Sequence, residues 1–80
     1  MNDLKPHQKD RNMFMQEVVS KLIERRKELR YTQADIDYKM GNSDGQCSKW
    51  ECGMRSPTAF NLFCWVLSLK LSIEVTPYEP

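Results

Sequence analysis

Apolar residues recur at three- and four-residue steps from residue 13 to residue 30, which is the spacing of one helix face. Val18, Leu22 and Leu29 belong to this stripe. The pattern predicts a first helix that ends near Arg30. Residues 1–12 show no periodic pattern, so we expect them to form a loose tail.

A capping pattern marks the start of a second, shorter helix. Thr32 precedes Asp35 by three residues, which is the spacing of a capping box. Ile36 and Met40 form an apolar pair behind this start. Gly41 is a typical helix stop, so we expect a helix of about two turns that ends there.

A third helix is predicted after a very short turn. Ser43 precedes Gln46 by three residues, which repeats the capping pattern. Gly53 is expected to end this helix. The apolar residues at helical spacing between these signals and just after them are Cys47, Trp50 and Met54.

A fourth helix and a strand complete the pattern. Ser56 followed by Pro57 predicts an N-cap with proline at the first helical position. The apolar residues of this helix are Phe60, Leu62, Phe63, Val66, Leu67 and Leu69. After them Leu71, Ile73 and Val75 alternate with polar residues, and this period of two predicts a half-buried strand.

A lone strand in a helical domain has no partner for its backbone groups within the chain. Two copies that run antiparallel across a two-fold axis would satisfy each other, so we expect a homodimer. The aromatic face of the fourth helix would pack beside the strands. In the alternative, this face covers the first helix within one chain. The predicted interface residues are Phe60, Cys64, Trp65, Leu71, Ile73 and Val75.

Two short helices joined by a tight glycine turn and braced by a preceding helix form the module that places its second helix in the DNA major groove. Three segments make the pattern specific: Thr32-Gln33, Ser48-Lys49-Trp50-Glu51-Cys52-Gly53 and Arg55-Ser56-Pro57. With the glycine turn between them, they resemble the lambda repressor and Cro-like helix-turn-helix family, also called the xenobiotic response element family. The resemblance implies an all-α bundle of four to five helices that binds double-stranded DNA. The alternative is an unrelated helical bundle with the same spacings.

A charged pair is expected inside the bundle. Arg26 lies on the apolar stripe of the first helix, and Glu51 lies on the inward edge of the third. Either charge alone would be costly there. If the two helices pack together, Arg26 and Glu51 can form a charge-assisted pair, which is also the role that the family resemblance implies.

The outward face of the third helix is the expected DNA-reading surface, because Cys47, Trp50 and Met54 are expected to turn to the core. Lys49 is the strongest candidate to read a base, since lysine donates to O6 and N7 of guanine. Gln46 fits either adenine or a capping box with Ser43, and the sequence does not decide between them.

Phosphate contacts are expected from helix N-termini and small polar donors. The family resemblance implies that Gln33 contacts the DNA backbone, and Arg55 would reach a flanking phosphate. Capping or solvation is the alternative for each residue. The predicted DNA-binding residues are Thr32, Gln33, Asn42, Ser43, Asp44, Gly45, Gln46, Ser48, Lys49 and Arg55.

Three residues depart from the family pattern. Asp37 stands where the family usually has alanine, and an acid there can hydrogen-bond across the turn toward the start of the third helix. Asp44 can accept from N4 of cytosine, or it only favours the helix dipole. Gly45 has no side chain, so we expect more reliance on DNA shape.

Length, charge and cysteine content bear on the domain division, the localisation and the cofactors of the protein. The chain has 80 residues, and we divide it into a tail (1–12), a DNA-binding domain (13–70) and a dimerisation segment (71–80). Its formal net charge is +1, so DNA binding requires a local basic edge. It lacks a membrane span and a secretory signal, so we expect a cytoplasmic protein. Three cysteines without a CxxC pair predict no metal and no cofactor.

The sequence thus predicts a transcriptional regulator that represses as a homodimer on a palindromic operator. The alternative is a DNA-binding antitoxin whose C-terminal region binds a toxin, and a co-regulator protein is a further possible partner. An enzyme is not expected, since no second catalytic group is placed near His7 or Cys52.

Overall fold

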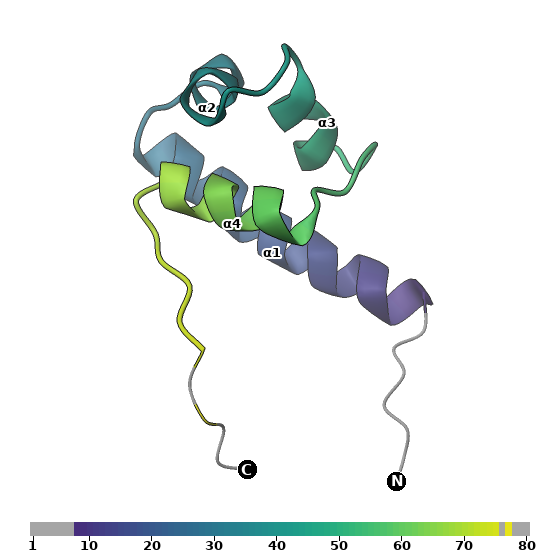
Figure 1. Cartoon of the computed structure of the whole chain (residues 1–80). Coiled ribbons are helices and arrows are strands. Elements are labelled where there is room, and N and C mark those ends of the chain that lie inside the picture. The colour runs from purple at the N-terminus through teal and green to yellow at the C-terminus, as the bar shows by residue number, and fades with distance from the viewer. Residues whose placement is uncertain (1–7, 76, 78–80) are drawn as a thin grey trace, which may run out of the picture.

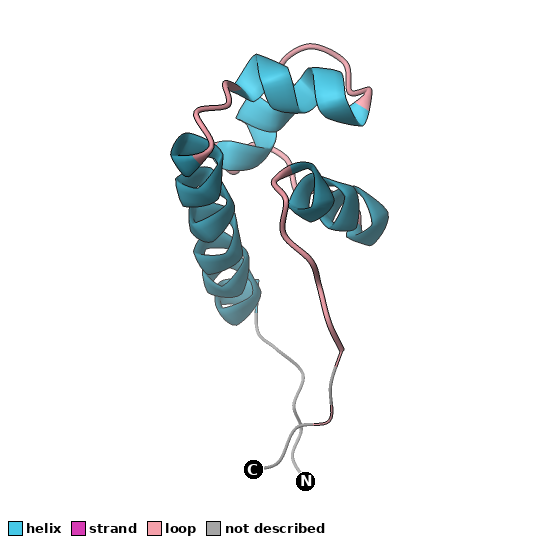
Figure 2. Ribbon diagram, turned by 90° about the vertical axis from the view of Figure 1, so that its left-hand side faces the viewer, coloured by secondary structure: helices cyan, strands magenta, loops and turns pink. Residues whose placement is uncertain are grey.

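The computed structural model describes residues 8–75 and 77, and these residues contain four helices and no strand. The helices are α1 (Gln8–Glu28), α2 (Gln33–Met40), α3 (Gln46–Glu51) and α4 (Ala59–Ser68). Figures 1 and 2 show α2 and α3 together on one side of the molecule, with α1 and α4 on the other. The expected all-helical fold is confirmed. None of the helices in this part of the chain has the length and apolar character needed to cross a membrane.

The first helix starts earlier than its apolar pattern predicts. α1 begins at Gln8 rather than at residue 13. Once a helix has nucleated, each added residue gains a hydrogen bond without a new nucleation cost, so polar residues can extend it. The predicted tail therefore loses residues 8–12 to α1, and residues 1–7 lie outside the described part.

The second helix follows its local signals closely. Thr32 Oγ1 accepts from the N–H of Asp35 at 3.0 Å, and the N–H of Thr32 donates to Asp35 Oδ2 at 2.7 Å. This is the predicted capping box, and Gly41 is the C-terminal cap residue as expected. Both signals are local in sequence, so they can be recognised without knowledge of the tertiary contacts.

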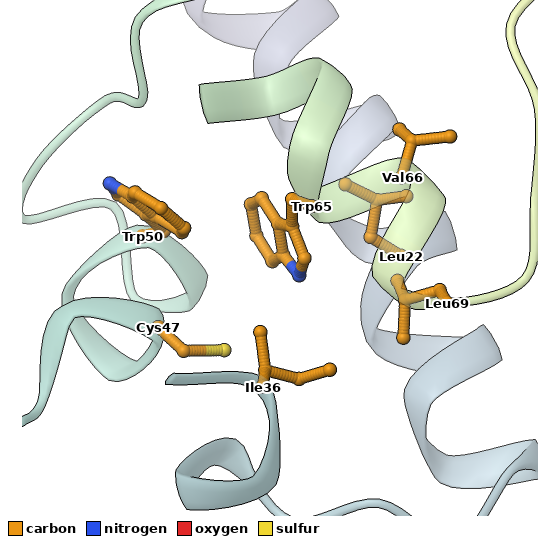
Figure 3. Packing of buried hydrophobic residues seen from close by; sticks show 7 residues of the cluster. All are labelled: Leu22, Ile36, Cys47, Trp50, Trp65, Val66 and Leu69. Atoms are coloured by element: carbon orange, nitrogen blue, oxygen red, sulfur yellow. The ribbon is translucent and has the colours of Figure 1, made fainter. Parts of the chain in front are cut away.

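The core lies where the four helices meet. Two indole rings are central to it, since the centroids of Trp50 and Trp65 are 5.1 Å apart and their planes are tilted by 35°. Figure 3 shows the Trp65 ring between Trp50 on one side and Leu22 on the other, with Ile36 close to Trp65. Trp65 is 0% exposed, so its predicted place at a dimer interface is wrong. The buried apolar residues are Leu22, Ile36, Cys47, Trp50, Trp65, Val66 and Leu69.

The loop between α3 and α4 also differs from prediction. α4 begins at Ala59 with Thr58 as its N-cap, and Thr58 Oγ1 accepts from the N–H of Asn61 at 3.1 Å. The predicted cap at Ser56 and Pro57 is wrong because the threonine hydroxyl supplies the acceptor two residues later. α3 ends at Glu51, so Met54 lies beyond it and is 70% exposed instead of buried.

The segment after α4 forms no strand within the single described chain. Residues 71–75 are exposed and lie in no regular element. Lys70 has the left-handed φ of 60°, and the N–H of Leu71 bonds the carbonyl of Val66 at 3.2 Å, which closes α4 and redirects the chain. Pairing of this segment with a second copy stays a prediction, and residues 76 and 78–80 lie outside the described part.

Candidate nucleic-acid interface

The turn between α2 and α3 is closed by backbone hydrogen bonds around Gly41. The N–H of Asn42 donates to the carbonyl of Asp37 at 2.9 Å, and the N–H of Gly41 donates to the carbonyl of Tyr38 at 3.2 Å. Gly41 has a φ of +70°, a conformation that glycine adopts without the strain other residues carry. These two bonds form a Schellman motif that ends α2 and turns the chain toward α3.

The side chain of Asp37 caps the start of α3 from α2. Its Oδ1 accepts from the N–H of Cys47 at 2.8 Å, and its Oδ2 accepts from the N–H of Gly45 at 3.0 Å. Gly45 is the N-cap residue and has no side chain of its own, so the Asp37 carboxylate supplies the missing acceptor. The expectation that Asp37 hydrogen-bonds toward the start of this helix is confirmed. Asp37 is buried, so this carboxylate fixes the angle between α2 and α3.

The predicted helix start at Ser43 is therefore wrong, and the capping box, one of the two alternatives for Gln46, does not form. α3 begins at Gln46 itself, and no side chain of its N-cap residue forms a capping hydrogen bond. Asn42 is also drawn into the turn, because its Nδ2 donates to Asp37 Oδ1 at 3.1 Å. The same nitrogen also donates to Met40 Sδ at 3.8 Å, so both N–H groups of this amide point into the turn, which favours a structural role for Asn42.

The polar side of α3 is open to solvent. Cys47 and Trp50 are buried against the core, while Ser48 and Lys49 on the other side are exposed and Gln46 is partly buried. α3 therefore has exposed polar side chains on the side that faces away from the core.

Most of the other predicted contact residues are exposed. Arg55 lies just beyond the helix, and its N–H donates to the carbonyl of Lys49 at 3.2 Å. The remaining exposed members of the predicted set are Thr32, Ser43, Asp44 and Gly45. Lys49 and Arg55 are the two basic residues in the predicted set, so the basic edge of this surface is small.

A buried ion pair ties α3 to α1. Arg26 Nε donates to Glu51 Oε2 at 2.7 Å, and Arg26 Nη2 donates to Glu51 Oε1 at 3.1 Å, so the pair is bidentate. Its side chains are 12% and 7% exposed, respectively. Arg26 Nη1 also donates to the carbonyl of Tyr31 at 2.8 Å. The predicted pair of Arg26 and Glu51 is present.

Glu51 also binds a residue that the sequence predicts as a DNA contact. Gln33 Nε2, at the start of α2, donates to Glu51 Oε1 at 2.8 Å. Cys47 Sγ donates to Glu51 Oε2 at 3.5 Å, so groups from α1, α2 and α3 meet at one carboxylate. Sequence reasoning missed this link because Gln33 carries no charge that would reveal a partner.

The surroundings of Glu51 set two pKa values. Burial alone favours the protonated acid, but hydrogen bonds from Arg26 and Gln33 and the charge of Arg26 outweigh it and hold the pKa of Glu51 below its usual value. Burial and the neighbouring Glu51 charge raise the pKa of the Cys47 thiol to about 12. Glu51 is therefore ionised and Cys47 is a neutral thiol at neutral pH.

Comparisons with protein-family models, with curated proteins and with solved structures found no match to this chain. The DNA-binding interpretation rests on the residues and their geometry. Among the described residues, no group of three or more histidine, cysteine or acidic side chains is arranged to hold a metal ion.

One hydrogen bond between α1 and α4 could not be predicted from the sequence pattern. Arg25 Nε donates to the carbonyl of Leu69, the C-cap of α4, at 3.0 Å. Arg25 Nη1 also contacts Glu28 Oε1 at 3.2 Å. Arg25 looks like an ordinary surface base in the sequence, and only the packing of α4 shows that it holds the end of that helix.

Proposed function

We propose that this chain is a sequence-specific DNA-binding transcriptional regulator that acts as a homodimer on a palindromic operator. The observation that carries the proposal is the exposed polar side of α3, which Asp37 anchors to α2 and Glu51 anchors to α1. A helix held rigidly from both neighbours, with one polar side free, fits the major groove of B-form DNA.

The reading residues are those on that side. Lys49 donates to O6 or N7 of a guanine, and Ser48 donates to a base or a phosphate. Gln46 is not part of a capping box, which supports its use in reading adenine. Asp44 accepts from N4 of cytosine.

Phosphate contacts come from the edges of the module. Gln33 at the start of α2 and Arg55 beyond the end of α3 lie on either side of the reading residues in sequence, and Thr32 and Ser43 add exposed hydroxyl groups. The near-neutral charge of the chain makes each basic contact a large share of the total. We therefore expect a shallow salt dependence for a single chain and a steeper one for the dimer.

The dimer is proposed from the outer side of α4. This helix contains no charged residue, and its outer stripe of Phe60, Phe63 and Leu67 is exposed although its inner side fills the core. An exposed apolar stripe of this kind often marks a protein–protein contact. Leu71, Ile73 and Val75, which follow α4 in the chain, are exposed as well, and Cys64 is partly buried. In the dimer, two α3 helices about 34 Å apart would enter successive major grooves.

The test is selection of bound sequences from random duplex DNA by the whole chain. A palindromic site, bound by two copies as measured by light scattering, supports the proposal. Uniform weak binding without a selected site overturns it. The same apolar stripe would also suit a toxin, and copurification of a second small protein that masks the stripe would favour the antitoxin function instead.

A further inference from the structure

The Gln33 side chain is held in place before any DNA arrives. Its Nε2 donates one hydrogen to Glu51 Oε1 at 2.8 Å, and the side chain is partly buried at the first position of α2. A carboxamide has a second N–H and a carbonyl oxygen. The bond to Glu51 therefore fixes the direction of the amide and leaves a donor for a second partner.

Glu51 is itself fixed from several directions. Two nitrogens of Arg26 bind its two oxygens, and Cys47 Sγ donates to Oε2. With only 7% of its side chain exposed, the carboxylate has little freedom to move. A group that hydrogen-bonds to the Glu51 carboxylate is therefore held in a defined position.

The pairing of Glu51 with Arg26 explains why a carboxylate can lie close to bound DNA. A free carboxylate would repel a nearby phosphate, but the guanidinium of Arg26 neutralises Glu51 within the protein. The chain of groups from Arg26 through Glu51 ends in the neutral amide of Gln33. The surface thus presents an oriented donor without a net negative charge.

We propose that Glu51 is a positioning residue that holds the Gln33 carboxamide ready to donate to a DNA phosphate. The inference rests on the proposed function, since it names how one backbone contact of that site is prepared. A glutamine fixed in advance loses less side-chain entropy on binding than a freely rotating one. Glu51 therefore strengthens DNA binding without contacting DNA.

The test removes the anchor while keeping the fold. Replacing Arg26 and Glu51 together by Arg26→Met and Glu51→Leu exchanges a buried pair for apolar residues of similar size, a change that is often neutral for stability. We measure the affinity of four chains for the duplex selected by the wild type: the wild type, Gln33→Ala, the apolar-pair variant and the three substitutions combined. Each is measured well below its thermal midpoint, and Gln16→Ala on the exposed side of α1 is the matched glutamine control.

The expected pattern is a double-mutant cycle with strong coupling. Gln33→Ala weakens binding about tenfold, because it loses one hydrogen bond to a charged phosphate. The apolar-pair variant weakens binding by no more than that, because it keeps the amide but must order it on binding. The combined chain binds no more weakly than Gln33→Ala, since an anchor has no effect on binding once the anchored amide is gone. The salt slope stays unchanged in all chains because the lost contact is uncharged. A fall in the slope with the apolar pair would instead show that Arg26 contacts DNA itself, and would overturn the inference.

Losses that multiply in the combined chain also overturn the inference, while the proposed function survives. A wild-type chain that selects no site overturns both. A second measurement needs no variant and so cannot be affected by misfolding of one. It is the ¹⁵N relaxation of Gln33 Nε2 in the wild-type protein without DNA. An amide as ordered as the surrounding backbone supports the anchor, and one that rotates freely refutes it.

Discussion

Breaking the pair of Arg26 and Glu51 is expected to destabilise the domain strongly. Arg26→Met keeps much of the side-chain volume but leaves the Glu51 carboxylate, 7% exposed, without its cation. Removing one partner of a buried ion pair costs about 3–5 kcal/mol. The whole domain is expected to have only about 4–12 kcal/mol of stability at this length, so the loss is a large fraction of the total.

The natural fluorescence of the chain provides the assay. Its two tryptophans, Trp50 and Trp65, are both buried in the core, so urea unfolding followed by tryptophan emission reports core exposure directly. A loss of 3 kcal/mol or more corresponds to a fall in thermal midpoint of about 12 °C or more for a domain of this size. Lys21→Met is the matched control on the same helix. Its pair with Glu17 is 72% and 69% exposed, so removing it is expected to cost less than about 1 kcal/mol.

The pH dependence gives a second, independent readout. The pKa of Glu51 is held below its usual 4.5 in the folded chain, so its contribution to stability is present above pH 4.5 and is lost as the pH falls through the folded value. Without Arg26, burial is left to raise the pKa of Glu51. The stability difference between wild type and Arg26→Met should therefore begin to shrink above pH 4.5, where Glu51 of the variant takes up a proton, and should shrink further as the pH falls through the folded pKa of the wild type.

Two results would refute this reasoning. One is a stability loss in Arg26→Met no larger than that in Lys21→Met. The other is a difference between wild type and Arg26→Met that stays constant from neutral pH to below pH 4.5. Adding Glu51→Leu to Arg26→Met should restore much of the stability, because no unpaired charge remains in the core.

Three further outcomes follow from the structure. Asp37→Ala should cost about 2–3 kcal/mol in urea unfolding, because it leaves the N–H groups of Gly45 and Cys47 without their acceptor, and a wild-type midpoint would show that the cap is dispensable. Lys49→Ala should reduce discrimination at one base position by about 1–3 kcal/mol without changing the unfolding midpoint; equal losses on every duplex would instead assign Lys49 to a phosphate. Iodoacetamide at mildly alkaline pH should modify exposed Cys52 but not Cys47, whose thiol has a pKa of about 12, and mass spectrometry of the peptides would reveal any early labelling of Cys47.

Local signals in the sequence were sufficient to predict a helix start or stop where the residues that form it are close along the chain. The capping box of Thr32 and Asp35 and the stop at Gly41 involve neighbouring residues only, so their chemistry is readable without the fold. The pair of Arg26 and Glu51 is an exception across 25 residues. It was predictable because a charge on an apolar stripe requires a partner.

Predictions were wrong where a residue distant in sequence supplies a helix cap in place of a nearby one. They were also wrong where the apolar pattern does not show which side of a helix faces the core. The cap of α3 comes from Asp37, eight residues before Gly45, so Ser43 looked like the cap only in the absence of tertiary structure. α4 contains only two polar residues, Asn61 and Ser68, so periodicity gives little indication of which side faces inward. The pattern therefore predicts Trp65 on the surface although it fills the core, whereas Phe60, Phe63 and Leu67 are the exposed apolar residues of this helix.

The brevity of α3 limits how its recognition surface could be transplanted. An isolated peptide of six residues is far shorter than the roughly 12–15 residues that a solitary helix needs in water. A synthetic peptide copying α3 should thus be unstructured, and a graft onto another scaffold must bring along the acid on the preceding helix and the arginine on the first. Engineers who wish to change the sequence preference of this protein should accordingly vary only the outward side chains and leave Asp37, Arg26 and Glu51 intact.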